Sequence, residues 1–207
     1  MNTPNKLTLS RIFLIPFFVL FLHIHQIMTS VSVIAIFHWL ALVIFIIAAI
    51  TDYLDGMIAR RQNIVTNFGK LFDPLADKLL TMAAFVAFVE LQGPNGKPIF
   101  PAWAIIVILA REFLVTGLRS LGASHGRVIH ADKWGKQKTI IQLVGIGLIL
   151  LSICMRDTFA MSFGKTAILD AWLPVFYRVV LAITVGITAA SGLVFLWKNW
   201  DLVSDRD

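Results

Sequence analysis

Long apolar runs recur along the whole 207-residue chain, separated by short segments rich in charged residues, glycine and proline. Each run is close to the ~20 residues that an α-helix needs to cross the hydrocarbon core of a bilayer. The pattern therefore predicts an all-α integral membrane protein, a single membrane-embedded domain spanning 1–207. A polar stretch at 3–8 precedes the first span and is expected to lie at the membrane interface. The six predicted transmembrane helices cover 9–28, 33–58, 70–91, 100–121, 137–155 and 175–197.

The connecting segments differ in their content of glycine, proline and charged residues. The segment 92–98 is dense in glycine and proline and predicts a tight turn. The segment 156–174 is predicted to be the longest loop. The first apolar run is not followed by a clear cleavage site, so it is interpreted as a retained helix and not as a signal peptide.

Composition agrees with a membrane protein: 58% of the residues are hydrophobic, 14% are charged, and the mean hydropathy is +0.82. Twelve of the 18 Lys and Arg residues lie on the side of both termini, four lie on the other side, and Lys78 and Arg111 lie within spans. The positive-inside rule then places both termini in the cytoplasm. The net charge of +6 is explained by loops facing anionic lipid, and nucleic acid is not expected as a partner.

Four aspartates, Asp52, Asp55, Asp73 and Asp77, lie within what otherwise reads as membrane. Ionised carboxylates are costly in a bilayer and usually mark a functional site. If the second and third spans form an antiparallel pair that turns near 61–67, Asp52 and Asp77 both lie roughly 12–13 Å below the turn, so the four carboxylates can meet in one pocket. Oxygen ligands suit hard divalent cations, which predicts a metal site open to the cytoplasm.

Two alternatives remain open for these aspartates. They could be paired with cations at the cytoplasmic rim, namely Arg60, Arg61, Lys70 and Lys78. They could instead line the ion or proton pathway of a cation-coupled transporter, although no duplicated half or broken pair of spans supports that reading.

The aspartates belong to a longer pattern, D-x2-D-G-x2-A-R-x8-G-x3-D-x3-D, that runs from Asp52 to Asp77. This pattern resembles the signature of the CDP-alcohol phosphatidyltransferases. The segments 5–11, 111–119 and 135–139 resemble the bacterial phosphatidylglycerophosphate synthases of that family. Family members are six-helix membrane enzymes that release CMP from a CDP-linked lipid or alcohol and form a phosphodiester on an incoming hydroxyl.

The resemblance implies a set of site residues. Asp52, Asp55, Asp73 and Asp77 would hold one or two Mg²⁺ or Mn²⁺ ions, and Asp77 would also be the general base. CDP-diacylglycerol would be bound by Asn5, Thr8, Gly56, Ala59, Arg60 and Gly69. The phosphate of sn-glycerol 3-phosphate would be bound by Arg111, Arg119 and Lys138.

Other roles are possible for several of these residues. Asn5 and Thr8 could act only as helix caps, and Arg111 could be paired with Glu112 or with an aspartate of the motif. Arg119 could be a loop charge of the positive-inside kind. The acceptor could also be another alcohol of the same chemistry, such as inositol phosphate or serine. The family further implies a homodimer in the bacterial inner membrane with a cytoplasmic active site.

Overall fold

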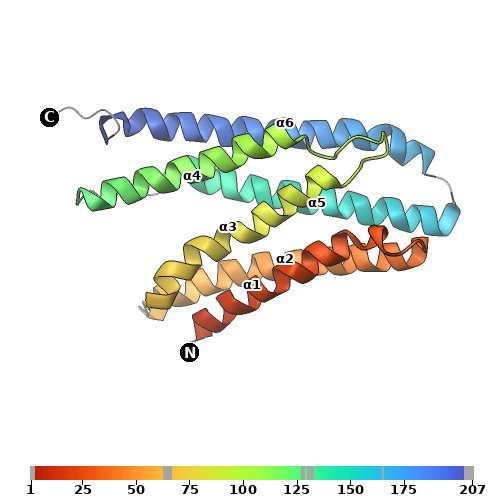
Figure 1. Cartoon of the computed structure of the whole chain (residues 1–207), viewed down its shortest axis with the longest axis horizontal. Coiled ribbons are helices and arrows are strands. Elements are labelled where there is room, and N and C mark those ends of the chain that lie inside the picture. Colours follow the sequence, from red (N-terminus) through yellow and green to blue (C-terminus); the bar gives the residue numbers. More distant parts are fainter. Residues whose placement is uncertain (1–2, 63–66, 127–128, 130–132, 165, 203–207) are drawn as a thin grey trace. The chain divides into compact units, whose positions relative to one another are not determined.

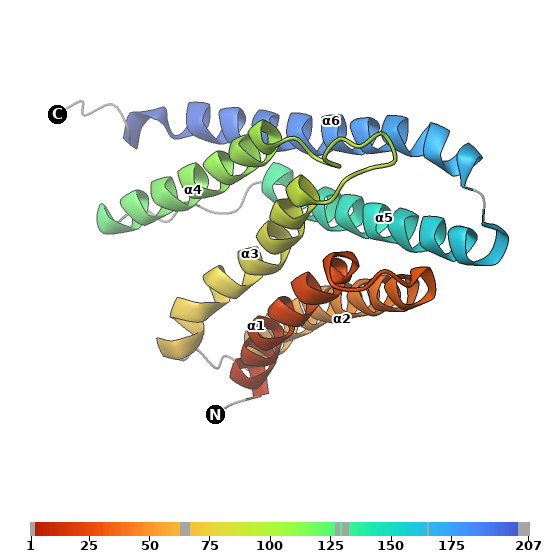
Figure 2. The same cartoon turned by 45° about the vertical axis from the view of Figure 1, so that its right-hand side comes forward.

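The computed structural model describes residues 3–62, 67–126, 129, 133–164 and 166–202, with the backbone alone described at 3–8, 53–62, 67–77, 133–134, 136 and 202. Within these ranges the chain forms six α-helices and no β-strand, as predicted. Figures 1 and 2 show them from two directions. The α-helices are α1 (Thr3–Leu22), α2 (Val31–Gln62), α3 (Asn67–Glu90), α4 (Ala102–Ser124), α5 (Lys133–Phe163) and α6 (Ala167–Lys198). Two short 3₁₀ turns, η1 (Ile24–Gln26) and η2 (Trp200–Leu202), follow α1 and α6.

Three of the described helical segments are long and apolar enough to cross a membrane: Val31–Asp52, Gln137–Phe163 and Ala167–Lys198. Leu9–Leu22 in α1 is a shorter apolar helix. Large apolar side chains point outward, among them Phe13, Ile106, Phe113 and Leu193, which are each 65–68% exposed. Such a surface suits lipid as the solvent, and the chain is a membrane protein.

The chain divides into two compact units. The first comprises Met1–Ile99 and Ile146–Pro174, and the second comprises Phe100–Gly145 and Val175–Asp207. Helices α5 and α6 therefore contribute residues to both units.

In the first unit, α1 packs against α2 and α3. The rings of Phe18 and Phe45 lie with their centroids 6.0 Å apart, and both side chains are buried. Fully buried alanines on α2 and α3, at Ala41, Ala48 and Ala84, leave room for close packing of helices, which is the usual way that membrane helices associate.

The turn predicted at 92–98 is present. An isolated β-bridge joins Gln92 to Pro98, and Gly96 has φ = 69°, a left-handed conformation that favours glycine.

The second unit is built on one buried face of α4. Its buried residues, which include Ile108, Glu112 and Val115, recur every three or four positions, as expected of a helix with one packed side. Val115, Leu118 and Phe195 of α6 form a hydrophobic cluster. Helix α5 comes close to α6 at Gly145, where a Cβ atom would lie 3.3 Å from side-chain atoms of both Val180 and Thr184.

One boundary prediction was wrong. The segment 156–174 is not a long loop, because α5 continues to Phe163 and α6 begins at Ala167. Helix α5 ends only where Gly164 adopts φ = 62°. Two charged residues of this segment pair across the turn, since Arg156 Nε donates to Asp170 Oδ1 at 2.7 Å. Pro174 lies inside α6, so it does not mark the start of that helix. At the other end of the chain, the backbone of 3–8 is helical and forms the first part of α1, and its expected place at the membrane interface stays a prediction.

In the first unit, two neighbouring residues of α2 make polar contacts with two neighbouring residues of α5. The buried ring of His38 faces Asp157 Oδ2 through Nδ1 at 2.5 Å and the carbonyl of Leu22 through Nε2 at 3.1 Å. Trp39 Nε1 donates to Thr158 Oγ1 at 3.0 Å.

Candidate functional site

The acidic motif lies at the end of α2 and the start of α3. Asp52 lies on α2, and its side chain is 35% exposed. The remaining predicted residues of this motif and of the N-terminal segment lie outside the residues whose side chains are described: Asn5, Thr8, Asp55, Gly56, Ala59, Arg60, Gly69, Asp73 and Asp77. Their backbone is helical in each case, so the predicted placement of the motif on two helices agrees with the structure.

Asp52 forms an ion pair with Arg11 of α1, whose Nη1 donates to Asp52 Oδ1. The arginine side chain is only 2% exposed, so this cation is buried against the carboxylate. The sequence predicted cations at the cytoplasmic rim as possible partners of the aspartates and did not predict Arg11 as one of them. A signal was available, because Arg11 stands within the first apolar run, and a cation there requires a nearby anion.

The described side chains do not test the metal site. Among them, no three His, Cys, Asp or Glu residues converge, and Asp52 alone of the four motif aspartates is included. The chemistry of the donor set nevertheless fits a hard divalent cation, since four carboxylates offer only oxygen ligands.

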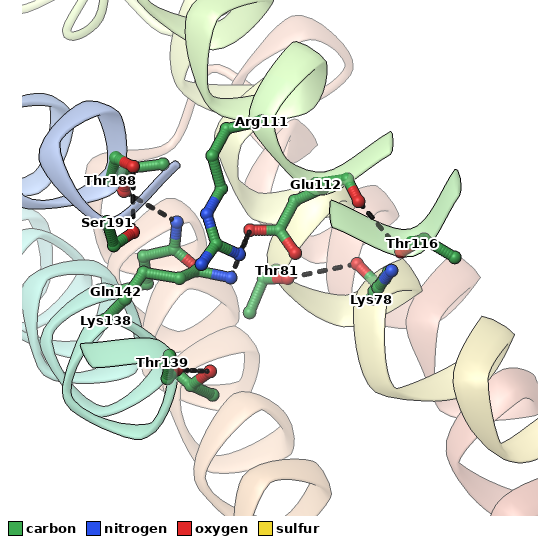
Figure 3. A network of polar contacts seen from close by, with 11 residues as sticks. Lys78, Thr81, Arg111, Glu112, Thr116, Lys138, Thr139, Gln142, Thr188 and Ser191 are labelled. Atoms are coloured by element: carbon green, nitrogen blue, oxygen red, sulfur yellow. Dashed lines mark hydrogen bonds and ion pairs between the residues drawn. The ribbon is translucent and has the colours of Figure 1, made fainter. Parts of the chain in front are cut away.

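In the second unit, the structure brings together Arg111, Glu112 and Lys138 (Figure 3). Lys138 Nζ of α5 donates to Glu112 Oε1, and Arg111 Nη1 lies 3.4 Å from the same oxygen. All three side chains are largely buried, with 7% of Lys138, 10% of Arg111 and 11% of Glu112 exposed. The pairing of Arg111 with Glu112 that the sequence left open as an alternative is therefore present. Glu112 itself was missed as a functional residue, although a carboxylate in an apolar helix was the signal for it.

Arg119 lies two helical turns beyond Arg111 on α4. Its guanidinium carbon is 5.6 Å from the centre of the Phe195 ring, within the range of a cation–π contact. The Nε atoms of both Arg111 and Arg119 are buried and have no hydrogen-bond partner within the described part of the chain. Buried donors normally find an acceptor, so these two indicate a place where a ligand with acceptor atoms would be stabilised.

Charge supports the same conclusion. Arg111, Arg119 and Lys138 contribute three cations, and Glu112 contributes one carboxylate. These four side chains therefore carry a net charge of +2, which a multiply charged anion can neutralise. Arginine is especially suited to a phosphate because its planar fork donates two parallel hydrogen bonds.

The surrounding polar contacts fix the helices that carry these cations. Gln142, one turn after Lys138, donates through Nε2 to Thr188 Oγ1 of α6 at 3.1 Å. Ser191 Oγ donates to the carbonyl of Thr188 at 2.9 Å. The three side chains are 0–3% exposed. Buried and mutually satisfied polar groups of this kind hold neighbouring helices in one register.

Comparison with known proteins then decides the family. The sequence pattern of the CDP-alcohol phosphatidyltransferases matches residues 1–188. The chain belongs to the CDP-alcohol phosphatidyltransferase family. The resemblance carried by the aspartate motif is thereby confirmed, and the chain is an enzyme of the phosphatidyltransferase class.

Similar proteins in this family come from several bacteria. A relative from Bacillus subtilis is 39% identical over 97% of this chain and 96% of its own length. A relative from Rickettsia typhi is 36% identical over 72% of this chain and 76% of its own length, and one from Mycoplasma pneumoniae is 31% identical over 92% and 82%. All three are named CDP-diacylglycerol–glycerol-3-phosphate 3-phosphatidyltransferase.

Proposed function

We propose that this protein transfers the phosphatidyl group of CDP-diacylglycerol to sn-glycerol 3-phosphate, giving phosphatidylglycerophosphate and CMP. The names of the relatives support the reaction, at 31–39% identity. Like them, the protein would act in a bacterial cell membrane. The distribution of Lys and Arg supports cytoplasmic termini and a cytoplasmic active site. The site would be formed in one membrane-embedded domain, and the enzyme would be a homodimer, as the family resemblance implies.

The observation that carries the choice of acceptor is the cationic cluster, which combines the largely buried Arg111 and Lys138 with Arg119, two helical turns along α4 from Arg111. A phosphate monoester carries a charge of about −1.5 to −2 at neutral pH, which is close to the +2 of the cluster with Glu112. Its oxygens would also supply acceptors for the buried Nε atoms of Arg111 and Arg119. An acceptor without a phosphate, such as serine, would leave this charge uncompensated, so the cluster favours glycerol 3-phosphate over serine.

Asp52, Asp55, Asp73 and Asp77 would hold one or two Mg²⁺ or Mn²⁺ ions. When bound, the metal would neutralise pyrophosphate oxygens and stabilise the charge that develops on departing CMP. Asn5, Thr8, Gly56, Ala59, Arg60 and Gly69 would bind the CDP-diacylglycerol.

The remaining steps belong to the side chains. Arg111, Arg119 and Lys138 bind the phosphate and thereby orient the acceptor hydroxyl. Asp77 accepts the proton of that hydroxyl as its oxygen forms a bond to the phosphorus that carries diacylglycerol. The bond from this phosphorus to the bridging oxygen breaks, and CMP leaves with that oxygen.

The test is CMP release from CDP-diacylglycerol by the purified protein in detergent, with and without divalent metal and sn-glycerol 3-phosphate. We expect release to require both additions. Asp55→Asn and Asp77→Asn should abolish it while the protein still elutes as a folded species, whereas Asp170→Asn, the same substitution at a half-exposed ion pair outside the motif, should retain it.

Other outcomes would refute parts of the proposal. Inositol phosphate also carries the charge that the cluster suits, and release with it but not with glycerol 3-phosphate would reassign the acceptor. Release with serine alone would overturn the argument from charge. Cation flux in reconstituted vesicles without CMP release would replace the enzyme with a transporter.

A further inference from the structure

Helix α6 presents a continuous face to the cationic cluster of the second unit. Thr188, Gly192 and Phe195 are spaced by four and three residues, so they lie on one side of the helix. Gly192 and Phe195 lie beyond residue 188, where the match to the family pattern ends. The family pattern therefore gives them no role, and the structure supplies one.

Gly192 contacts the side chain of Arg111 closely. A Cβ atom added at Gly192 would lie 2.7 Å from Arg111 Cγ, 3.6 Å from its Cβ and 3.9 Å from its Cδ. Contacts under 3.0 Å are not tolerated between carbon atoms. The atom that clashes is near the base of the side chain, so relief requires a different Arg111 rotamer or a wider separation of α4 and α6. Either change moves the guanidinium.

Phe195 contacts the second arginine, Arg119, through the face of its ring. Its ring lies under the guanidinium of Arg119 at 5.6 Å and is itself buried, 6% exposed, against Val115 and Leu118. A packed ring has one orientation, so the arginine that rests on it is held in a defined direction. At Thr188, the hydrogen bond from Gln142 fixes the distance between α6 and the helix that carries Lys138.

We propose that Gly192 and Phe195 are positioning residues of α6 that direct Arg111 and Arg119 toward the phosphate of the acceptor. The inference rests on the proposed function and deepens it, because it assigns acceptor binding partly to a helix that makes no contribution to the acidic motif. Gly192 acts through the absence of a side chain, and Phe195 acts through its ring. Neither residue donates a hydrogen bond to the substrate.

The experiment compares Gly192→Ala with Gly186→Ala. Both substitutions add one methyl group to α6, but at Gly186 the new atom has no heavy atom within 4 Å outside the local helix backbone. In the CMP-release assay, Gly192→Ala should raise the KM for sn-glycerol 3-phosphate by tenfold or more and leave the KM for CDP-diacylglycerol within twofold. Gly186→Ala should leave both constants within twofold.

A double-mutant cycle separates positioning from general damage to the fold. If Gly192 acts through Arg111, adding Gly192→Ala to Arg111→Ala should change the KM for glycerol 3-phosphate by less than twofold. Phe195→Leu, which keeps an apolar side chain but removes the π face, is a second variant in case Gly192→Ala does not fold. It should raise the same KM by threefold or more.

Three results would overturn the inference. These are an unchanged KM for glycerol 3-phosphate in both Gly192→Ala and Phe195→Leu, an equal rise in the two KM values, or full additivity of Gly192→Ala with Arg111→Ala. The proposed function fails separately, if the unsubstituted protein does not release CMP in response to glycerol 3-phosphate.

Discussion

Replacing Glu112 by glutamine tests whether the carboxylate holds the cationic cluster together. The substitution keeps the shape of the side chain and removes the charge that accepts from Lys138 and Arg111. Because the three side chains are only 7–11% exposed, the two cations would remain buried without their anion. Removing one partner of a buried ion pair costs about 3–5 kcal/mol.

The expected change in thermal stability follows from that cost. A chain of this size shifts its unfolding temperature by about 2–4 °C per kcal/mol, so Glu112→Gln should lower it by at least about 6 °C. The matched control is Glu90→Gln. Glu90 also lies against a basic side chain, with its Oε2 3.2 Å from His23 Nε2, but it is 63% exposed, and pairs at such exposed sites contribute about 0–1 kcal/mol. The control should therefore shift by less than about 4 °C.

The assay is thermal unfolding in one detergent at one protein concentration, followed by intrinsic tryptophan fluorescence. The comparison of two identical substitutions removes effects of the detergent on the unfolded state. Equal shifts for Glu112→Gln and Glu90→Gln would refute the argument that burial makes the Glu112 cluster important. A Glu112→Gln protein with a higher unfolding temperature would refute it more strongly, since the carboxylate would then destabilise the folded protein.

Three further predictions follow from single features. Arg119→Gln removes one charge-assisted hydrogen bond to the acceptor phosphate, and such a bond typically contributes about 1.5–3 kcal/mol. The KM for glycerol 3-phosphate should therefore rise about tenfold or more in the CMP-release assay. An unchanged KM would mean that Arg119 is only a positively charged residue of the cytoplasmic loop. Gly164→Ala places a Cβ at φ = 62° and should lower the free energy of unfolding by about 1–2 kcal/mol. The control Gly117→Ala adds the same methyl group in open space within α4 and should not lower it. Equal effects in thermal unfolding would contradict the argument that the turn at Gly164 requires glycine. Partial desolvation of its otherwise exposed side chain and the neighbouring ring of His38 lower the pKa of His25, in the turn after α1. The unfolded chain therefore binds a proton more readily, and stability should fall as the pH falls through about 6.5. His25→Asn should show a shallower loss between pH 8 and pH 5, and an unchanged pH dependence would contradict this.

The helices could be predicted from the sequence because each apolar run had to satisfy its backbone within a bilayer. Their ends could not be predicted equally well. The last span was predicted to begin at 175, yet α6 begins at Ala167 and includes Pro174. Arg156 and Asp170 lie in the segment predicted as a loop, but they pair with each other across a short turn. Local composition does not reveal whether two charges neutralise each other, because that depends on where the chain turns.

The candidate site was predictable where its residues form a pattern along the chain. The aspartate motif was recognised in this way, and Arg111, Arg119 and Lys138 were singled out. The contacts between helices could not be read from spacing: Arg11 and Asp52 are 41 residues apart, and Glu112 and Lys138 are 26 apart. Gly192 gave no signal at all, because its importance lies in an arginine that packs against it.

The pairing of His38 with Asp157 has a consequence for the biogenesis of the protein. The partners are 119 residues apart, so α2 emerges from the ribosome long before α5. At about 5–20 residues per second, the delay is roughly 6–24 s. During that time the ring of His38 must stay in the membrane without its carboxylate, and a polar group that lacks its hydrogen-bond partner is costly there. When α5 is inserted, it supplies Asp157 as the partner of His38 and Thr158 as the partner of Trp39. A helix that is synthesised late therefore completes the polar contacts of α2, which is synthesised early.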